Sequence, residues 1–118
     1  MPFSLGKKFR LASHGDFRRI IGNVNLRQKL YGISLYICAN NLGYCRLGVV
    51  VPKKNIPGAV QRNYCKRVAR ELFRLRREQL GSLDIVLVVR STCIDRLFSV
   101  IQNMLDKLIH EENFIAIH

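Results

Sequence analysis

Hydrophobic residues recur with two different periods along this chain, and the periods predict which segments are strands. Residues 33–39 alternate between apolar and polar positions, as in a strand with two unlike faces. One face contains Ile33, Leu35 and Ile37, and the other contains Ser34, Tyr36 and Cys38. Residues 83–89 form an apolar run rich in valine and isoleucine. This run predicts a central strand that is buried on both faces and reached through a helical crossover.

A further strand is expected at residues 46–51, directly after a turn. Asn40, Asn41 and Gly43 are residue types that tight turns favour. Two extended segments joined by such a short connection usually pair with each other. We therefore expect residues 33–39 and 46–51 to form a hairpin.

Two amphipathic helices are expected near the ends of the chain. In the first, the Ser13 hydroxyl can cap the helix, Asp16 lies near the positive end of the dipole, and the helix ends at Gly22. Its apolar stripe consists of Phe17, Ile20 and Ile21. Arg27 and Lys29 are interpreted as part of a polar connection that follows. The final helix begins at residue 94, and apolar residues recur in it at intervals of three and four: Leu97, Phe98, Ile101, Leu105, Leu108 and Ile109.

Residues 60–80 predict the longest helix, with two chemically different sides. At about 100° per residue, six of its seven cations and one asparagine fall within an arc of about 140°. They are Arg62, Asn63, Lys66, Arg67, Arg70, Arg74 and Arg77. A second arc of similar width is expected to be buried and contains Val60, Tyr64, Cys65, Val68, Leu72 and Leu75. Phe73 projects into the cationic arc, and we expect it to be a core anchor.

Folding alone does not explain this cationic arc. Like charges four residues apart destabilise a helix by about 0.2–0.5 kcal/mol per pair, and Glu71 is the acidic residue placed to offset them. The simplest alternative is a solvated helix face, but such faces normally mix both signs of charge. Arginine presents a planar fork that binds phosphate with two hydrogen bonds. The arc therefore indicates a polyanionic partner.

The charge of the whole chain also favours nucleic acid. Its 118 residues include 20 Lys plus Arg against 8 Asp plus Glu, a formal net charge of +12. Such a field attracts a phosphate backbone and releases the counterions condensed on it. A membrane surface is the alternative partner, but the sequence contains no apolar run of about 18 residues that could span a bilayer. We expect no membrane association.

Length and composition predict a single domain over residues 1–118, since 48% hydrophobic residues suffice for a core. The four cysteines have no zinc-finger spacing and are expected to be free thiols. They are Cys38, Cys45, Cys65 and Cys93. The first residues contain no continuous apolar signal segment, so we expect a cytoplasmic protein.

The sequence indicates no catalytic site of its own. Hydrolytic metal centres need clustered carboxylates or histidines, and the acidic residues here are spread along the chain. His14, His110 and His118 lie toward the ends, where an exposed side chain is more common than a general base. We therefore expect no catalytic residue and no metal ligand.

The run QRNYCKRVARELFRLR, residues 61–76, resembles the signature of the protein subunit of bacterial ribonuclease P. The matching residues are Arg62, Asn63, Lys66, Arg67, Arg70, Glu71, Phe73 and Arg74. The flanking residues follow the order of the family: Phe9, Arg10, Leu11, Asp16, Phe17, Leu35, Tyr36, Lys53 and Lys54. The resemblance covers residues 3–109.

The resemblance implies that the chemistry belongs to an RNA. The small basic protein of this family binds a catalytic RNA and the single-stranded 5′ leader of precursor tRNA. The holoenzyme is an endoribonuclease that removes the leader, with magnesium ions held chiefly by RNA and substrate. The implied fold is an α/β single-domain sandwich of α-β-β-β-α-β-α order, with a small mixed sheet packed with helices. A left-handed β-α-β crossover is also implied, although right-handed crossovers are the rule.

By resemblance, two surfaces would contact RNA. The residues expected to contact the catalytic RNA are Lys53, Lys54, Arg62, Asn63, Lys66, Arg67, Arg70 and Arg74. A shallow cleft between the first helix and the sheet would bind the leader through Phe17, Ile21 and Tyr36, with Lys66 at its border. Aromatic rings stack on unpaired bases of any identity. For Phe17, core packing is an equal alternative, whereas Tyr36 is favoured as a binding residue because it lies opposite the apolar face of its strand.

Two residues depart from the family pattern. Tyr64 stands where a second arginine is usual, which removes one expected phosphate contact, and Ile21 stands where many relatives have a second aromatic residue. Two other functions remain open at this point: a different small basic RNA-binding protein, such as a ribosomal component, and a nuclease that acts without RNA. Neither explains the matched spacing from Phe17 to Arg74.

Overall fold

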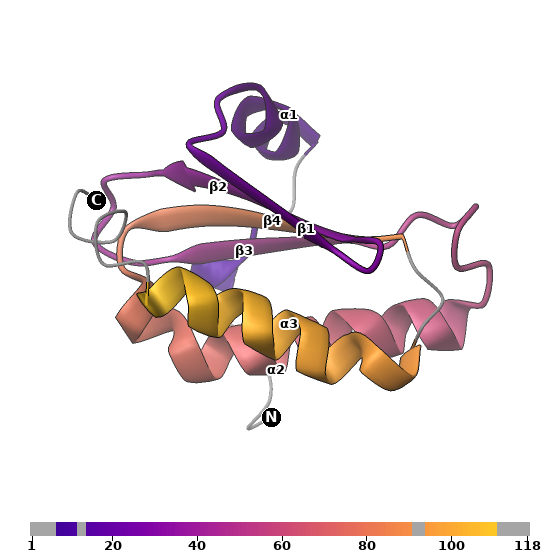
Figure 1. Cartoon of the computed structure of the whole chain (residues 1–118). Helices are drawn as coiled ribbons and strands as arrows, with labels where there is room; N and C mark the ends of the chain where they lie inside the picture. Colours follow the sequence, from indigo (N-terminus) through magenta and orange to yellow (C-terminus); the bar gives the residue numbers. More distant parts are fainter. Residues whose placement is uncertain (1–6, 12–13, 91–93, 111–118) are drawn as a thin grey trace.

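A four-stranded mixed sheet separates one helix from two others (Figure 1). The computed structural model describes residues 7–11, 14–90 and 94–110. The elements are η1 (Lys7–Phe9), α1 (His14–Gly22), β1 (Leu26–Leu30), β2 (Ile33–Ala39), β3 (Arg46–Val50), α2 (Ala59–Leu80), β4 (Leu83–Val89) and α3 (Ile94–His110). In Figure 1, α1 lies above the sheet and α2 and α3 lie together below it. This arrangement confirms the expected α/β fold and the α-β-β-β-α-β-α order.

The strand order β1-β2-β4-β3 shows that the predicted hairpin is wrong. β2 pairs with β1 on one side and with β4 on the other, and β3 pairs in parallel with β4. The hairpin of this fold is instead β1–β2, whose turn residues Tyr31 and Gly32 have φ angles of 49° and 76°, as two-residue hairpin turns require. Periodicity gives the faces of a strand but not its neighbours, and the polar segment LRQKL concealed β1.

β4 occupies the middle of the sheet, and all seven of its residues are buried. It is reached from β3 through α2, so the predicted helical crossover between parallel strands is confirmed. The hand of this crossover stays a prediction. The central position explains why this segment is so apolar, since helices cover both faces of the sheet.

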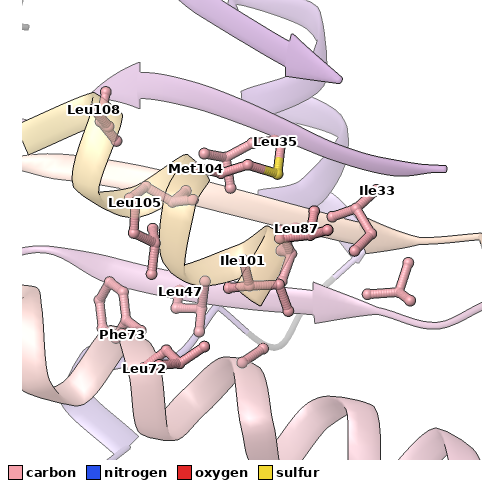
Figure 2. Close-up of a cluster of buried hydrophobic side chains, with 14 of the residues drawn as sticks. Ile33, Leu35, Leu47, Leu72, Phe73, Leu87, Ile101, Met104, Leu105 and Leu108 are labelled. Carbon is pink, nitrogen blue, oxygen red and sulfur yellow. The ribbon is translucent and has the colours of Figure 1, made fainter. Parts of the chain in front are cut away.

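The larger core lies between the sheet and the α2–α3 layer (Figure 2). The sheet contributes Ile33, Leu35, Leu47 and Leu87, α2 contributes Leu72 and Phe73, and α3 contributes Ile101, Met104, Leu105 and Leu108. Phe73 is fully buried, as predicted. The alternation of β2 is confirmed, because its odd-numbered residues from 33 to 37 belong to this core.

A smaller core lies under α1 on the opposite face. It contains Leu11, Ile20, Cys38, Val86 and Val88, with Phe17, Tyr36 and Val50 partly buried against it. Gly48 makes this packing possible, because a Cβ built at this position would lie 2.3 Å from Cε1 of Phe17. The ring of Phe17 therefore rests on the backbone of β3, and it serves packing at least in part.

The buried side of α2 differs from the predicted arc. Val60, Tyr64 and Leu75 were expected in the core but are 83%, 38% and 61% exposed. The buried residues are Cys65, Ala69, Leu72, Phe73 and Leu80. This stripe is displaced around the helix by about 100°, or one residue, because α2 must contact both the sheet and α3. Similarly, Phe98 of α3 was predicted in the apolar stripe and is 52% exposed.

Some predicted features lie at or beyond the limits of the described residues. α1 ends at Gly22 as predicted, whereas its proposed cap, Ser13, is outside the described residues. Cys38, Cys45 and Cys65 are buried free thiols, as expected, and Cys93 is outside the described residues. Burial raises the pKa of the Cys65 thiol.

Candidate nucleic-acid interface

One side of α2, between its buried stripe and its exposed side, forms a cationic flank. We define this flank as Lys66, Arg67, Arg70, Arg74 and Arg77. Arg77 stacks over the Phe9 ring, with 4.2 Å between the guanidinium carbon and the ring centroid. Arg70 lies close enough to Arg10 to be affected by its charge, and Arg10 bridges to Leu47 of β3. The flank therefore faces the β3 edge of the sheet and the η1 segment.

Arg70 is a half-buried cation of the flank that lies near a second cation, Arg10. Burial of its side chain and the charge of Arg10 both lower the pKa of Arg70. Each cause disfavours a cation in the free protein. A phosphate group placed here would favour the charged form and so offset both effects, which makes this position suited to an anion.

Two of the predicted RNA-binding cations are already engaged within the protein. Nη1 of Arg62 donates to the carbonyl oxygens of Ile56 and Pro57, at 2.9 and 2.5 Å, and so ties α2 to the loop before it. Nη2 and Nε of Arg74 donate to the Glu71 carboxylate at 2.8 and 3.2 Å. The hydrogen bond from Arg74 lowers the pKa of Glu71. Contact with RNA through these two arginines stays a prediction, because their guanidinium groups would have to share or exchange partners.

Four further predicted residues of this surface are open to solvent, whereas Lys66 is half-buried. Asn63 and Arg67 are exposed on α2. Lys53 and Lys54 are exposed in the turn that follows β3. The lysine pair and the α2 cations therefore follow one another along a single stretch of chain, from the end of β3 through α2. Arg76, by contrast, serves the fold: its Nε donates to Oδ1 of Asp106 in α3 at 2.6 Å.

An aromatic cluster beside the flank was not predicted. The rings of Phe9 and Tyr44 meet edge to face with centroids 5.6 Å apart. Nζ of Lys8 lies 4.4 Å from the Tyr44 centroid, and Arg77 covers Phe9. A cation over an aromatic face is attracted by the ring electrostatically, which favours a defined direction for the Lys8 and Arg77 side chains. The order Phe9, Arg10, Leu11 matched the family, but nothing in the spacing indicated the contact with Tyr44.

Three of the residues predicted for the leader cleft lie in α1 or beneath it on the same face of the sheet, and the cleft itself stays a prediction. Phe17 and Tyr36 both lie at the margin of the small core there, and Ile21 of α1 is 43% exposed. Lys66 belongs to α2, which covers the opposite face of the sheet. The structure therefore brings Phe17 and Tyr36 together through one cluster, whereas Lys66 is held in a different layer.

Tyr36 has a distinctly cationic environment. The guanidinium carbon of Arg27 lies 5.3 Å from the ring centroid. Burial alone would raise the pKa of the Tyr36 hydroxyl, but hydrogen bonds with Arg90 and Ser34 and the charges of Arg90 and Arg27 outweigh it, so that the pKa is lowered. A half-buried ring flanked by two arginines is suited to stacking on a base while the cations hold its phosphates.

Asp84 connects four parts of the fold, and sequence analysis missed it. This carboxylate is fully buried on β4. Arg46 of β3 binds it through Nε and Nη2 at 2.8 and 2.7 Å, Arg19 of α1 donates at 2.9 Å, and Asn40 donates at 2.9 Å. Burial raises its pKa, but these hydrogen bonds outweigh burial and the net pKa is lowered. An acid inside an apolar central strand was the signal that could have revealed this network.

The described residues contain no group of three or more His, Cys, Asp or Glu side chains that could hold a metal ion. Three of the carboxylates pair with arginines instead: Asp84 with Arg19 and Arg46, Glu71 with Arg74, and Asp106 with Arg76. Among the described helices, none is both long enough and apolar enough to cross a membrane. His110 is exposed at the end of α3, and His118 is outside the described residues.

Comparisons with known proteins agree with this geometry. A family model described as Ribonuclease P matches residues 5–112. The chain is 35% identical to the ribonuclease P protein component of Coxiella burnetii, over 85% of this chain and 89% of that protein. For the Vibrio cholerae component, identity is 32% over 90% and 89%.

Solved structures give the same result. The RNase P protein of Staphylococcus aureus superposes with a TM-score of 0.72 and 30% identity, over 86% of this chain and 92% of that chain. The protein from Thermotoga maritima superposes with a TM-score of 0.71 and 27% identity, over 85% and 94%. The residues matched by the family model include every element from η1 to α3.

Proposed function

The chain belongs to the ribonuclease P protein family, and we propose which of its surfaces binds which RNA. The protein component of ribonuclease P assists processing of the 5′ leader of precursor tRNA. It is a subunit of the ribonuclease P holoenzyme, an endoribonuclease, and associates with ribonuclease P RNA. We propose that the cationic flank of α2 binds this catalytic RNA and that the α1 face of the sheet binds the leader.

The cationic flank supports the first part of the proposal. Its arginines lie on one side of a helix of 22 residues, and the burial of Phe73 and its neighbours determines which side of that helix faces the core. Folded RNA is recognised largely by its shape and phosphates, which a rigid array of guanidinium groups fits. Six residues would make these contacts directly: Lys53, Lys54, Asn63, Lys66, Arg67 and Arg70. Arg62 and Arg74 would contact RNA after sharing or exchanging their present hydrogen-bond partners.

Phe17 and Tyr36 support the second part. Single-stranded leaders differ in sequence between substrates, so a binding site must tolerate any base. Aromatic stacking meets this need, at about 1–3 kcal/mol per base. Arg27 and Arg90 beside Tyr36 would follow the leader backbone, and Ile21 would add an apolar contact at a position where, by the resemblance, an aromatic residue is common.

Ribonuclease P activity is generally magnesium-dependent. The described acidic residues that pair with arginines are poorly suited as magnesium ligands. As the resemblance to the family implies, we assign magnesium to the catalytic RNA and the substrate, and the hydrolytic chemistry to the RNA. The protein would act in the cytoplasm, where it would bind, orient and neutralise phosphates without supplying a nucleophile or a general base.

Reconstitution tests this function. Precursor tRNA is incubated at low magnesium with the protein alone, with bacterial catalytic RNA alone, and with both. We expect cleavage at the mature 5′ end to be faster with both than with RNA alone, because phosphate neutralisation by the protein replaces part of the magnesium requirement. We expect no cleavage with protein alone, because the chemistry is assigned to the RNA. Cleavage by protein alone, or no stimulation of the RNA, would contradict the proposal.

A further inference from the structure

A shallow hollow at the border of the cationic flank contains two residues, Val60 and Tyr64, that neither the core nor the phosphate contacts proposed above explain. It has a volume of about 320 Å³ and is lined by Val60, Asn63, Tyr64 and Arg67. Val60 is 83% exposed and Tyr64 is 38% exposed. Neither residue belongs to one of the two buried clusters. The protein thus exposes an aromatic ring and an apolar side chain on the first two turns of α2.

The lining residues combine three kinds of chemistry in one place. The guanidinium carbon of Arg67 lies 5.8 Å from the centroid of the Tyr64 ring, at the outer limit of about 6 Å for a cation–π contact. Val60 adds an apolar surface, and the amide of Asn63 offers both donors and an acceptor. No acidic residue lines the hollow. A flat ring, a flat cation and an amide are the groups that proteins use to bind unpaired bases.

We propose that this hollow binds one unpaired nucleobase of the catalytic RNA, stacked on the ring of Tyr64. The inference rests on the proposed function, since it takes the catalytic RNA as the partner of α2. Arg67 connects the hollow to the cationic flank, so a base in the hollow would have its phosphates near Arg67 and Arg70. The cations at this border favour RNA over an apolar protein partner, which would have to desolvate them. Tyr64 would therefore replace a phosphate contact by a base contact.

Salt titration of binding to the catalytic RNA distinguishes stacking from charge. We expect Tyr64→Ala to weaken binding by about 5- to 150-fold, the effect of losing one stacked base. Tyr64→Phe keeps the ring and is expected to bind like the wild type. The slope of log K against log salt should be the same for all three proteins, because a stacked base releases no counterion.

Tyr31 provides a matched control. It is 57% exposed and also has an arginine over its ring, with Arg96 at 5.4 Å, but it lies in the β1–β2 turn. Tyr31→Ala should leave binding unchanged. Chemical probing of the unpaired bases of the catalytic RNA should find one nucleotide that is protected by the wild type and by Tyr64→Phe, and reactive with Tyr64→Ala.

Four results would overturn the inference. Wild-type binding by Tyr64→Ala would mean that no base stacks on the ring. Equal losses in Tyr64→Phe and Tyr64→Ala would assign the effect to the hydroxyl group. A smaller salt slope in Tyr64→Ala would mean that Tyr64 acts by positioning Arg67. A lower melting temperature of Tyr64→Ala would mean that the ring is packed. Failure of the proposed function would instead appear with the wild type, as a catalytic RNA that the protein neither binds nor stimulates.

Discussion

At the scale of single residues, Asp84 shows how one side chain can hold several elements of the fold together. It is fully buried, and a buried carboxylate is stable only when it is paired and hydrogen-bonded. Arg46, Arg19 and Asn40 supply four hydrogen bonds to it. Through these bonds one side chain joins β4, β3, α1 and the loop after β2. The position of α1 over the sheet, and with it the proposed leader cleft, therefore depends on this carboxylate.

Replacing Asp84 by Asn should lower the free energy of unfolding by about 3 kcal/mol, at the lower end of the range for breaking a buried ion pair. The lower end applies because Arg46 and Arg19 are 23% and 44% exposed and keep contact with water. Urea unfolding measures this loss. Asp106→Asn is the matched control: Asp106 is 43% exposed in its pair with Arg76, so about 0–1 kcal/mol is expected.

The dependence of stability on pH tests the same carboxylate. Because the pKa of Asp84 is lowered in the folded protein, the unfolded state binds more protons and stability falls with acidification. The contribution of Asp84 is complete above the ordinary carboxyl pKa of about 3.9 and is lost as the pH falls through the lowered value. The variant Asp84→Asn should therefore lose less stability than the wild type over this acidic range. Parallel curves would mean that the carboxylate is not held by its arginines.

At the scale of elements, the sequence predicted which face of each strand is buried better than it predicted which strands pair. The bounds of β2 and β4 agree with the predicted segments, because their apolar patterns directly reflect burial. The pairing of β2 with β3 was wrong because β4, more than thirty residues later, lies between them. β1 was missed because an edge strand with polar side chains resembles a loop.

The α2 surface was predicted only in part, because a sequence pattern gives the side of a helix on which a residue lies but not its neighbours. A helical projection locates the cations but not the partners that the fold gives them. Arg62 bonds to loop carbonyls, and Arg74 bonds to Glu71. The projection also counted Val60, Tyr64 and Leu75 as core, although α2 turns these residues to solvent. The structure is therefore needed to identify which cations remain available to RNA.

Arg67 gives the clearest test of the cationic flank, because it is exposed on α2, whereas Arg62 and Arg74 would first have to give up hydrogen bonds within the protein. Arg67→Ala should weaken binding to the catalytic RNA and reduce the magnitude of the salt slope by about 0.7–0.9 for one lost phosphate contact. Filter binding over a series of salt concentrations measures both quantities. Arg96→Ala, at an exposed arginine of α3, removes the same charge from another place and should leave the slope within error. An unchanged slope in Arg67→Ala would mean that this side chain does not contact phosphate.

At the scale of the whole molecule, the sheet separates the two proposed RNA surfaces. Tyr36 lies on the α1 face and the cationic flank lies on α2, below the opposite face (Figure 1). The smaller core and the larger core share no side chain. Sites that are well separated and share no partner contribute independently to binding. The net charge of +12 acts on both, since it draws RNA to the entire protein.

This separation predicts additive defects. Tyr36→Ala should weaken binding of leader-bearing precursor tRNA to the holoenzyme by about 1–3 kcal/mol and leave binding of mature tRNA unchanged, whereas Tyr36→Phe keeps the ring and should be nearly neutral. The loss of leader binding caused by Tyr36→Ala should be the same, within about 0.5 kcal/mol, in the wild-type background and in the Arg67→Ala background. Both are measured at saturating protein, so that the holoenzyme is fully assembled.

Coupling between the two variants would have a definite physical meaning. If Arg67→Ala changed the cost of Tyr36→Ala by more than this amount, the catalytic RNA bound to α2 would have to reach around the β3 edge and contact the leader itself. If Tyr36→Ala weakened mature and leader-bearing tRNA equally, the α1 face would bind the tRNA body instead. Additive, leader-specific losses would mean that the sheet acts as a rigid spacer, holding one RNA on each side at a fixed separation while the catalytic RNA performs the cleavage.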